Sequence, residues 1–220
     1  MKSVVILSAG LDSAVAMGIA RRDGEVCLAI TFDYGQKAAK KEIEYARKLC
    51  EYFGVEHRVI ELPWMKQFES GLTKGEVPEV SVEILEKHAE ETAKAVWVPN
   101  RNMVFIAIAA AFAENYGCDT VVVGFNKEEA ETFPDNTKEF VERINKALEL
   151  STMSKISVYA PLIDKTKKEI VEIGASMQFP FYLTWSCYYS YDKPCMKCES
   201  CVRRSEAFKA AGVTDPWTQK

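Results

Sequence analysis

The sequence has 220 residues, of which 48% are hydrophobic and 27% are charged, with a net charge of -4. This is enough apolar material for one sizeable core without a composition break, so we expect a single domain over residues 1–220. The acidic balance argues against nucleic acid as a direct partner and favours small-molecule substrates. No apolar run reaches the roughly 20 residues of a membrane span and the first residues do not resemble a signal peptide, so we expect a cytoplasmic protein.

Five short runs rich in Val and Ile, each bounded by turn residues, predict strands. They cover residues 3–7, 25–32, 56–62, 120–124 and 156–160. Segments with helical spacing cover residues 13–22, 38–53, 102–116 and 137–149, and further helices are expected to start at Thr166, in a capping box with Glu169, and near Cys201. The alternation predicts a Rossmann-like, doubly wound α/β fold, with a five-stranded parallel sheet and ligands at the carboxyl ends of its strands.

Residues 64–98 interrupt this pattern with a mixed polar composition, two glycines and an acidic stretch. We interpret them as an insertion. An insertion near a ligand-binding edge is either a lid or a solvated irregular excursion, and the sequence leaves both interpretations open.

The first predicted strand leads into a turn of small residues that precedes a helix. The turn is Ser8-Ala9-Gly10-Leu11-Asp12-Ser13. Such a turn presents free backbone N–H groups and the positive end of the helix dipole, and serine hydroxyls can donate to phosphate oxygens. An aspartate in an anion site is explained by Mg²⁺ that joins it to the phosphates, so we predict a Mg-ATP site. The alternative is a plain strand-to-helix connection in which Ser and Asp act as caps.

This turn resembles the Ser-Gly-Gly-x-Asp-Ser loop of the N-type ATP pyrophosphatases, which include argininosuccinate, asparagine and GMP synthetases and tRNA thiolation enzymes. Ala9 stands where that family usually has glycine, and its Cβ restricts φ. The resemblance implies a fold of the adenine nucleotide alpha hydrolase type, ATP binding by residues 8–13 and a catalytic role for Asp12. It also implies that adenine lies against Asp33 and Tyr34 at the end of the second strand, although turn chemistry alone explains those two residues equally well.

Four of the seven cysteines form one cluster in the sequence. They are Cys187, Cys195, Cys198 and Cys201, with the spacing C-x7-C-x2-C-x2-C. Because cytosolic thiols are kept reduced, such a cluster points to a metal rather than to disulfides. Four sulfur ligands suit one structural Zn²⁺ per chain with closed coordination, and an iron–sulfur cluster is the chemical alternative. The other cysteines, Cys27, Cys50 and Cys118, are expected to be small buried residues.

A second resemblance covers nearly the whole chain. It rests on residues 185–212 around the cysteines, Val98-Pro99-Asn100-Arg101-Asn102, Phe133-Pro134-Asp135, Ala160-Pro161-Leu162 and the helix start at Thr166, together with the small-residue turn. In this order the segments resemble the 7-cyano-7-deazaguanine synthase family. The resemblance places a zinc-binding module at residues 185–220 within the single domain.

That family implies an ATP-dependent carbon–nitrogen ligase. Its members convert 7-carboxy-7-deazaguanine and ammonia to the nitrile through adenylated intermediates and release AMP and pyrophosphate, in the biosynthesis of queuosine or archaeosine. The chain has only two histidines, His57 and His88, and no glutaminase-like nucleophile arrangement, so free ammonia is the expected nitrogen donor. Both histidines are expected to be structural or surface groups.

Three further residues are candidates for the site. Arg101, which precedes a helix, can hold a phosphate or the substrate carboxylate and act in catalysis, with surface solvation as the alternative. Asp135 can bind donor N–H groups of the deazaguanine or cap the following helix. Lys165, with Lys168 nearby, can reach the ATP phosphates or belong to a solvated helix start.

Two other functions remain open on sequence grounds. A tRNA thiolation enzyme would share the phosphate-binding turn but would need a persulfide-handling cysteine and a basic surface. A nucleic-acid or protein-binding module built on a zinc ribbon would make the turn merely structural. The sequence does not determine the oligomeric state, for which we expect a homo-oligomer, nor the residues that bind the deazapurine ring or the final modified nucleoside.

Overall fold

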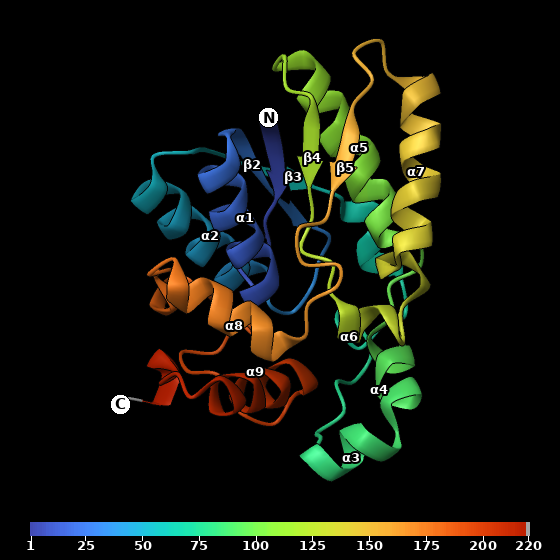
Figure 1. Ribbon diagram of the computed structural model, residues 1–220. Helices are drawn as coiled ribbons and strands as arrows, with labels where there is room; N and C mark the ends of the chain where they lie inside the picture. The colour runs from blue at the N-terminus through green and yellow to red at the C-terminus, as the bar shows by residue number, and fades with distance from the viewer. Residues whose placement is uncertain (219–220) are drawn as a thin grey trace.

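The computed structural model describes residues 1–218, which are built around a sheet of five parallel strands (Figure 1). The strands are β1 (Lys2–Ile6), β2 (Glu25–Asp33), β3 (Glu56–Glu61), β4 (Thr120–Val122) and β5 (Ser157–Tyr159). Their order is β3-β2-β1-β4-β5. The predicted strands and the α/β fold are confirmed, with ends that agree within two residues.

Helices cover both faces of the sheet. One face carries α1 (Leu11–Asp23), α2 (Ala39–Phe53) and α8 (Lys167–Ser176), and the other carries α5 (Arg101–Asn115) and α7 (Lys138–Ser151) (Figure 1). Two separate clusters of buried apolar side chains fill the two sides. Burial on both faces explains why β2 has an unbroken buried run at residues 28–32 instead of an alternating pattern.

Local signals in the sequence set several helix ends. The predicted capping box forms at the start of α8, where Thr166 and Glu169 exchange hydrogen bonds between side chain and backbone. Helix α2 ends at Gly54, which has a left-handed φ of 67° that glycine adopts without strain. The last long helix, α9 (Glu199–Ala211), packs against α8. It begins two residues earlier than the sequence predicts.

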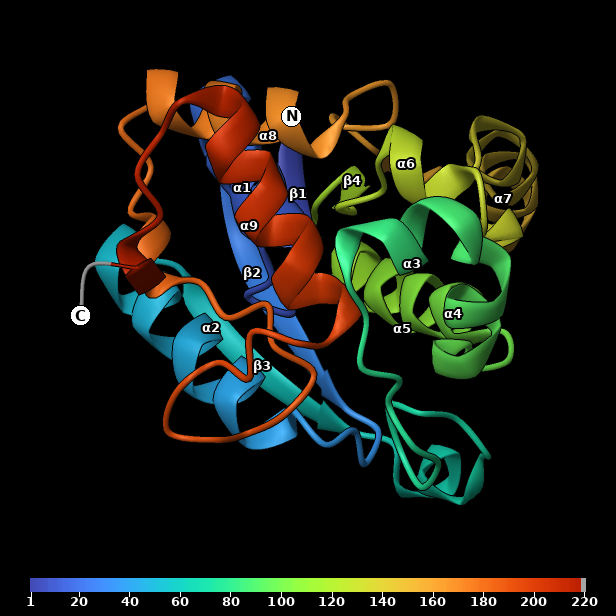
Figure 2. The ribbon, with the colours of Figure 1, turned by 90° about the horizontal axis from the view of Figure 1, so that it is seen from below.

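The strand order reverses direction along the sheet at β1, which lies between β2 and β4. In doubly wound sheets this reversal leaves a crevice at the carboxyl ends of the two strands, because the connecting helices leave to opposite faces. Figure 2 looks onto this end of the sheet, where α9 lies beside α3 (Val82–Lys87) and near α4 (Ala89–Val96). The fold therefore directs a ligand to the region beneath these helices.

The insertion at residues 64–98 is folded onto this end of the molecule. It contains α3, α4 and a 3-10 turn at Pro63–Gln67, so it is not an irregular excursion. The Lys37 ammonium donates to the carbonyl oxygens of Gly71, Thr73 and Gly75 at 2.6–2.7 Å, and this holds the irregular part in place. Its last residues, Val96 to Val98, line the main cavity.

The two histidines and the three isolated cysteines have no contact with that cavity. His57 shares a 2.8 Å hydrogen bond with Thr31 Oγ1, and burial lowers the pKa of its imidazole. His88 is exposed between α3 and α4. Cys50 and Cys118 are buried as predicted, whereas Cys27 is partly exposed.

Across residues 1–218, no single helix has the length and apolar composition needed to cross a membrane. Only α4 and α5 taken together, across a bend of 52°, reach those limits.

Candidate functional site

A cavity of about 250 Å³ lies at the carboxyl ends of β1 and β4. Its floor is formed by the end of β1, the first turn of α1 and the loop after β4, and its walls come from α2, α5, the insertion and the segment before α9. The lining includes Ser8, Gly10, Asp12, Ser13, Tyr34, Glu42, Arg101, Gly124, Glu129, Asp135, Lys167 and Tyr188. Segments that are distant in the sequence therefore converge on one site.

The small-residue turn, called here the phosphate loop (residues 8–13), is closed by its own serines. Ser8 Oγ and Ser13 Oγ are 3.0 Å apart, and the Gly10 N–H donates to Ser8 Oγ at 3.3 Å. Gly10 is the N-cap of α1 and provides no side-chain cap, so the first-turn N–H groups of the helix have no capping partner there. Neither Ser nor Asp caps this helix, which favours an anion-binding turn over a plain connection.

Ala9 adopts a left-handed backbone conformation, with φ of 59°. Its side chain is fully buried in the core on the α1 side of the sheet and does not line the cavity. The Cβ therefore does not crowd the nucleotide side of the loop. The carbonyl oxygen of Ala9 accepts a 2.8 Å hydrogen bond from the Trp185 N–H, which joins the phosphate loop to the cysteine-containing segment.

Gly124, just after β4, allows the loop to approach the start of α1. A Cβ at this position would lie 2.6 Å from the Ser13 backbone nitrogen and 2.8 Å from its Cα. Any side chain here would push the phosphate loop away from the sheet. The end of β4 thus lies directly against the phosphate loop.

Asp12 faces two charged groups from other elements. The Lys167 ammonium, at the start of α8, lies 2.6 Å from Asp12 Oδ2 and 2.9 Å from Glu129 Oε1. Burial raises the pKa of Asp12 to about 6, and Lys167 partly offsets this shift. Burial lowers the pKa of Lys167, but the two carboxylates raise it by more, so the lysine stays charged.

The second carboxylate oxygen of Asp12 has no hydrogen-bond partner among residues 1–218, although it is buried. A buried acceptor without a donor is costly unless a ligand satisfies it. Carboxylate oxygens are the ligands that Mg²⁺ prefers. The residues at Asp12 therefore fit a divalent cation placed between the carboxylate and a bound phosphate.

Arg101 lies inside the cavity wall and is not a solvated surface group. Its Nη1 donates to the Tyr34 hydroxyl at 3.0 Å, and its guanidinium faces the carboxylates of Asp135 and Glu42. Burial raises the pKa of Glu42 to about 7, and that carboxylate accepts a 2.8 Å hydrogen bond from Gln36. A cation among buried acceptors forms a polar wall opposite the phosphate loop.

Asp135 does not cap the following helix. Thr137 is the N-cap of α7 and accepts from the Phe140 N–H, while Asp135 lines the cavity and accepts from Asn136. Burial raises the pKa of Asp135, with Arg101 acting in the opposite direction. The carboxylate is thus available to a ligand.

Three predicted residues do not line the cavity: Ala9, which is buried in the core, Asp33 and Lys165. Asp33 accepts a 3.0 Å hydrogen bond from the Gly35 N–H, which is turn chemistry, while its neighbour Tyr34 does line the cavity. Lys165 lies outside the cavity, and Lys168 is exposed and pairs with Glu172 at 3.5 Å. Lys167, between them, is the lysine that points inward. Sequence reasoning missed it, as well as Glu129 and Glu42, because no local motif marks them.

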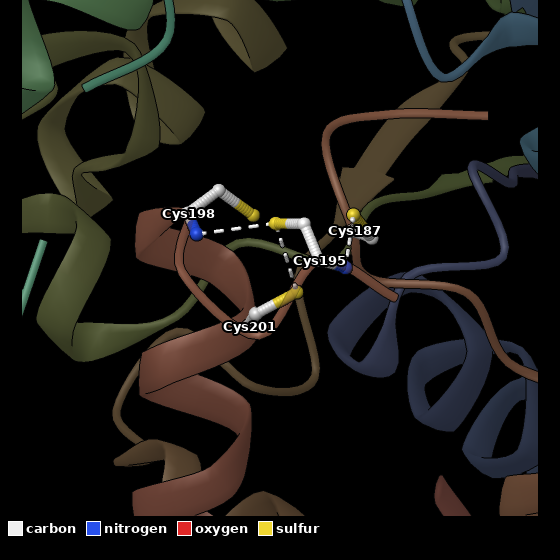
Figure 3. Close-up of side chains that lie close together, drawn as sticks. All are labelled: Cys187, Cys195, Cys198 and Cys201. Atoms are coloured by element: carbon white, nitrogen blue, oxygen red, sulfur yellow. Dashed lines mark hydrogen bonds between the residues drawn. The ribbon is translucent and has the colours of Figure 1, made fainter. Parts of the chain in front are cut away.

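The four clustered cysteines lie close together in space (Figure 3), and their sequence neighbours Ser186, Tyr188 and Ser200 line the cavity. Their sulfur atoms all lie within 4.8 Å of one another, and Cys195 Sγ is 3.9 Å from Cys201 Sγ. Two backbone N–H groups point at sulfur, from Cys195 to Cys187 and from Cys198 to Cys195, each at 3.3 Å. The predicted cluster is confirmed as an arrangement that can hold a metal ion.

A buried arginine ties α9 to the segment that carries the first cysteine. Arg204 is 1% exposed and makes a two-point ion pair with Asp215 at 2.8 and 2.9 Å. Its third nitrogen donates to Thr184 at 2.7 Å, and the guanidinium stacks 3.9 Å from the ring of Trp217. These contacts position Trp185 and Cys187 beside the phosphate loop.

The fold and the site define a doubly wound α/β protein whose main cavity lies at the carboxyl ends of its parallel strands. Two solved structures share this fold. NMN synthetase from Francisella tularensis superposes with a TM-score of 0.51 and 15% identity over 96% of this chain and 77% of its own. The U34-tRNA thiolase NcsA from Methanococcus maripaludis with its 4Fe–4S cluster has a TM-score of 0.50 and 17% identity over 95% of this chain and 64% of its own. At these identities the likeness concerns the fold alone.

The chain belongs to the family described as queuosine biosynthesis protein QueC, whose model matches residues 2–212. A relative from Methanosarcina barkeri is 48% identical over 100% of this chain and 99% of its own length, and one from Pelotomaculum thermopropionicum is 50% identical over 97% and 99%. Both are named 7-cyano-7-deazaguanine synthase, a ligase-type enzyme. The resemblance found in the sequence is confirmed at the level of the family.

Proposed function

We propose that this chain is an ATP-dependent ligase that converts 7-carboxy-7-deazaguanine and ammonia to 7-cyano-7-deazaguanine through adenylated intermediates. The observation that carries the proposal is the buried, unpartnered oxygen of Asp12 beside the uncapped start of α1. That arrangement suits a nucleotide whose phosphates meet the helix N-terminus and a divalent cation. We extend the proposal to one domain over residues 1–220, acting in the cytoplasm as a homo-oligomer on small molecules.

A carboxylate is a poor electrophile and must be activated before ammonia can attack it. In the first round its oxygen attacks the α-phosphorus of ATP, which forms the acyl-adenylate and releases pyrophosphate. Ammonia then displaces AMP and loses a proton, which gives the amide. In the second round the amide oxygen is adenylated in the same way, with release of pyrophosphate, and loss of AMP and of both N–H protons leaves the nitrile.

The position of each residue in the cavity indicates its role in these two rounds. The amides and hydroxyls of the phosphate loop hold the phosphates, and Lys167 adds positive charge where pyrophosphate leaves. Asp12 would hold Mg²⁺, which would supply further charge neutralisation at the phosphates. Arg101 holds the substrate carboxylate, while Asp135 and Glu42 accept hydrogen bonds from the N–H groups of the deazapurine ring.

For the cysteine centre we propose one structural Zn²⁺. Four sulfurs about 2.3 Å from one tetrahedral ion lie about 3.8 Å from each other, and an iron–sulfur cluster, which places several iron atoms between them, holds them further apart. The closest Sγ–Sγ distance of 3.9 Å agrees with the single ion. Four thiolates leave no open coordination position, so this metal supports the fold and takes no part in the reaction.

The proposal is tested by incubating the protein with ATP, Mg²⁺, ammonium and 7-carboxy-7-deazaguanine. Mass spectrometry should detect the amide and then the nitrile, and chromatography should find AMP with pyrophosphate. ADP with phosphate would instead mean phosphorylation and would overturn the adenylation step. A protein that makes neither AMP nor the amide with this substrate would contradict the proposed function.

A further inference from the structure

A second, smaller cavity adjoins the main one. It has a volume of about 30 Å³ and shares five lining residues with the main cavity: Glu129, Phe133, Lys167, Tyr188 and Ser200. Its remaining lining comes from Glu128, Thr132, Glu199 and Arg203. It therefore lies behind the wall of the main cavity and has room for one or two molecules of the size of water.

Negative charge exceeds positive charge around this cavity. Lys167 pairs with Asp12 and Glu129, and Arg203 pairs with Glu199 at 2.7 Å and with Glu128 at 3.6 Å. Of these groups, three carboxylates and two cations line the small cavity itself. Uncompensated negative charge in a largely buried site is costly, so the site favours an additional cation.

One of these carboxylates is incompletely bonded. Glu199, the first residue of α9, is only 6% exposed. Its Oε1 accepts from Arg203 Nε, but its Oε2 is buried and has no partner among residues 1–218. An unpaired acceptor on the wall of a small acidic cavity calls for a ligand that donates hydrogen bonds.

The size and the charge of the small cavity together limit which ligands it can bind. Mg²⁺ keeps a near-ideal octahedral shell with several waters, for which about 30 Å³ is too small. Ammonium is about as large as water, carries one positive charge and donates hydrogen bonds in tetrahedral directions. We infer that the small cavity is an ammonium-binding site, from which the nitrogen passes the shared wall to the activated carbon in the main cavity as ammonia, after ammonium has released one proton to solvent.

This inference rests on the proposed function, because it names where the nitrogen substrate binds. The test uses Glu199→Gln, which keeps the size of the side chain and removes its charge. The KM for ammonium, measured by nitrile formation at saturating ATP and deazaguanine, should rise by about tenfold or more, since a charge-assisted hydrogen bond is worth about 1.5–3 kcal/mol. Exchange of labelled pyrophosphate into ATP without ammonium should stay unchanged.

Three controls distinguish a loss of ammonium binding from a structural disturbance of the protein. Glu172→Gln removes an acid from a similar i,i+4 ion pair on α8, away from the cavity, and should leave the KM for ammonium unchanged. Metal content must be measured in both variants because Glu199 neighbours Cys198, and it should equal that of the unaltered protein. Hydroxylamine, which is uncharged near neutral pH, displaces AMP to give a hydroxamate, and its KM should be the same in Glu199→Gln and the unaltered protein.

The outcomes are distinguishable. An unchanged KM for ammonium in Glu199→Gln would mean that the cavity holds only water, and the inference would fail while the proposed function stands. Equal increases for ammonium and hydroxylamine would mean distortion of the site and would also overturn it. If the unaltered protein exchanges no pyrophosphate and forms no nitrile, the proposed function itself fails.

Discussion

The phosphate loop and the cysteine segment, residues 184–201, lie side by side but obtain their order in different ways. The phosphate loop joins a buried strand to a buried helix, and Val4, Val5 and Leu7 before it are at most 1% exposed. The cysteine segment has no helix or strand before α9 begins at Glu199. Hydrophobic burial therefore orders the first region, whereas the second depends on four sulfurs and the Arg204–Asp215 pair.

The two regions meet at one backbone hydrogen bond, from Trp185 N–H to the Ala9 carbonyl. Trp185 is two residues from Cys187 in the sequence, so the cysteine cluster and the phosphate loop are mechanically connected. We therefore expect an asymmetry between the two regions. Disorder in the cysteine segment should make the phosphate loop less ordered, whereas loss of nucleotide binding should leave the cysteine cluster intact.

The largest effect is expected from Cys201→Ser. Loss of one of four ligands should abolish stoichiometric metal binding and lower the free energy of unfolding by more than about 4 kcal/mol, as for other lost structural metals. Metal analysis and chemical denaturation measure both, and hydrogen exchange should increase most in residues 184–218. Cys27→Ser, distant from the cluster, is the matched control. Retention of one metal ion per chain in Cys201→Ser would refute the four-ligand site.

The next largest effect concerns the other region. Asp12→Asn should reduce substrate-dependent pyrophosphate exchange by about a hundredfold or more, because the amide replaces the charged oxygen that would hold the cation. Metal content in the cysteine cluster should not change. Asp23→Asn, at the exposed end of the same helix, should exchange pyrophosphate normally. Exchange within a fewfold of normal in Asp12→Asn would remove this residue from the reaction.

A smaller effect is expected at Glu42, on the cavity wall. Its folded pKa of about 7 lies above the ordinary 4.5, so the stability it contributes is present below pH 4.5 and is lost as the pH rises through 7. Glu42→Gln removes this loss, and at pH 8 it should be about 2–3 kcal/mol more stable than the unaltered protein, but similar at pH 4. Urea denaturation at both pH values measures the difference. Glu51→Gln, exposed on the same helix, should show none, and equal stability of Glu42→Gln at pH 8 would contradict the prediction.

The smallest effect is expected where the two regions meet. Ala9 has a positive φ, which costs an L-residue about 1–2 kcal/mol, while glycine loses more chain entropy on folding. Ala9→Gly should therefore raise the free energy of unfolding by less than about 1 kcal/mol. Ala16→Gly, inside α1, should lower it by about 1 kcal/mol instead. A destabilised Ala9→Gly would show that the methyl group, which is buried in the core, matters more than the backbone strain.

Individual residues show which features could be predicted from neighbours in the sequence and which depend on tertiary contacts. The five strands, the Thr166 capping box and the end of α2 at Gly54 depend on neighbours in the sequence, and all were predictable. The order within the insertion was not, because α3 packs against α9 and the loop before it is held by the Lys37 ammonium, both of which are distant in the sequence. The choice among Lys165, Lys167 and Lys168 also escaped prediction, since a rotation of one residue about α8 decides which lysine faces Asp12.

The sequence by itself determined the α/β class, the place of the small-residue turn and the cluster of four cysteines, because periodicity, turn chemistry and cysteine spacing act over a few residues. Only the tertiary structure decided which side chains share the cavity: Lys167 with Asp12, Arg101 with Glu42, and Glu199 with its unpaired oxygen. Burial, pKa shifts and unpaired atoms depend on groups that lie far apart along the chain and become neighbours only when the sheet and its helices pack.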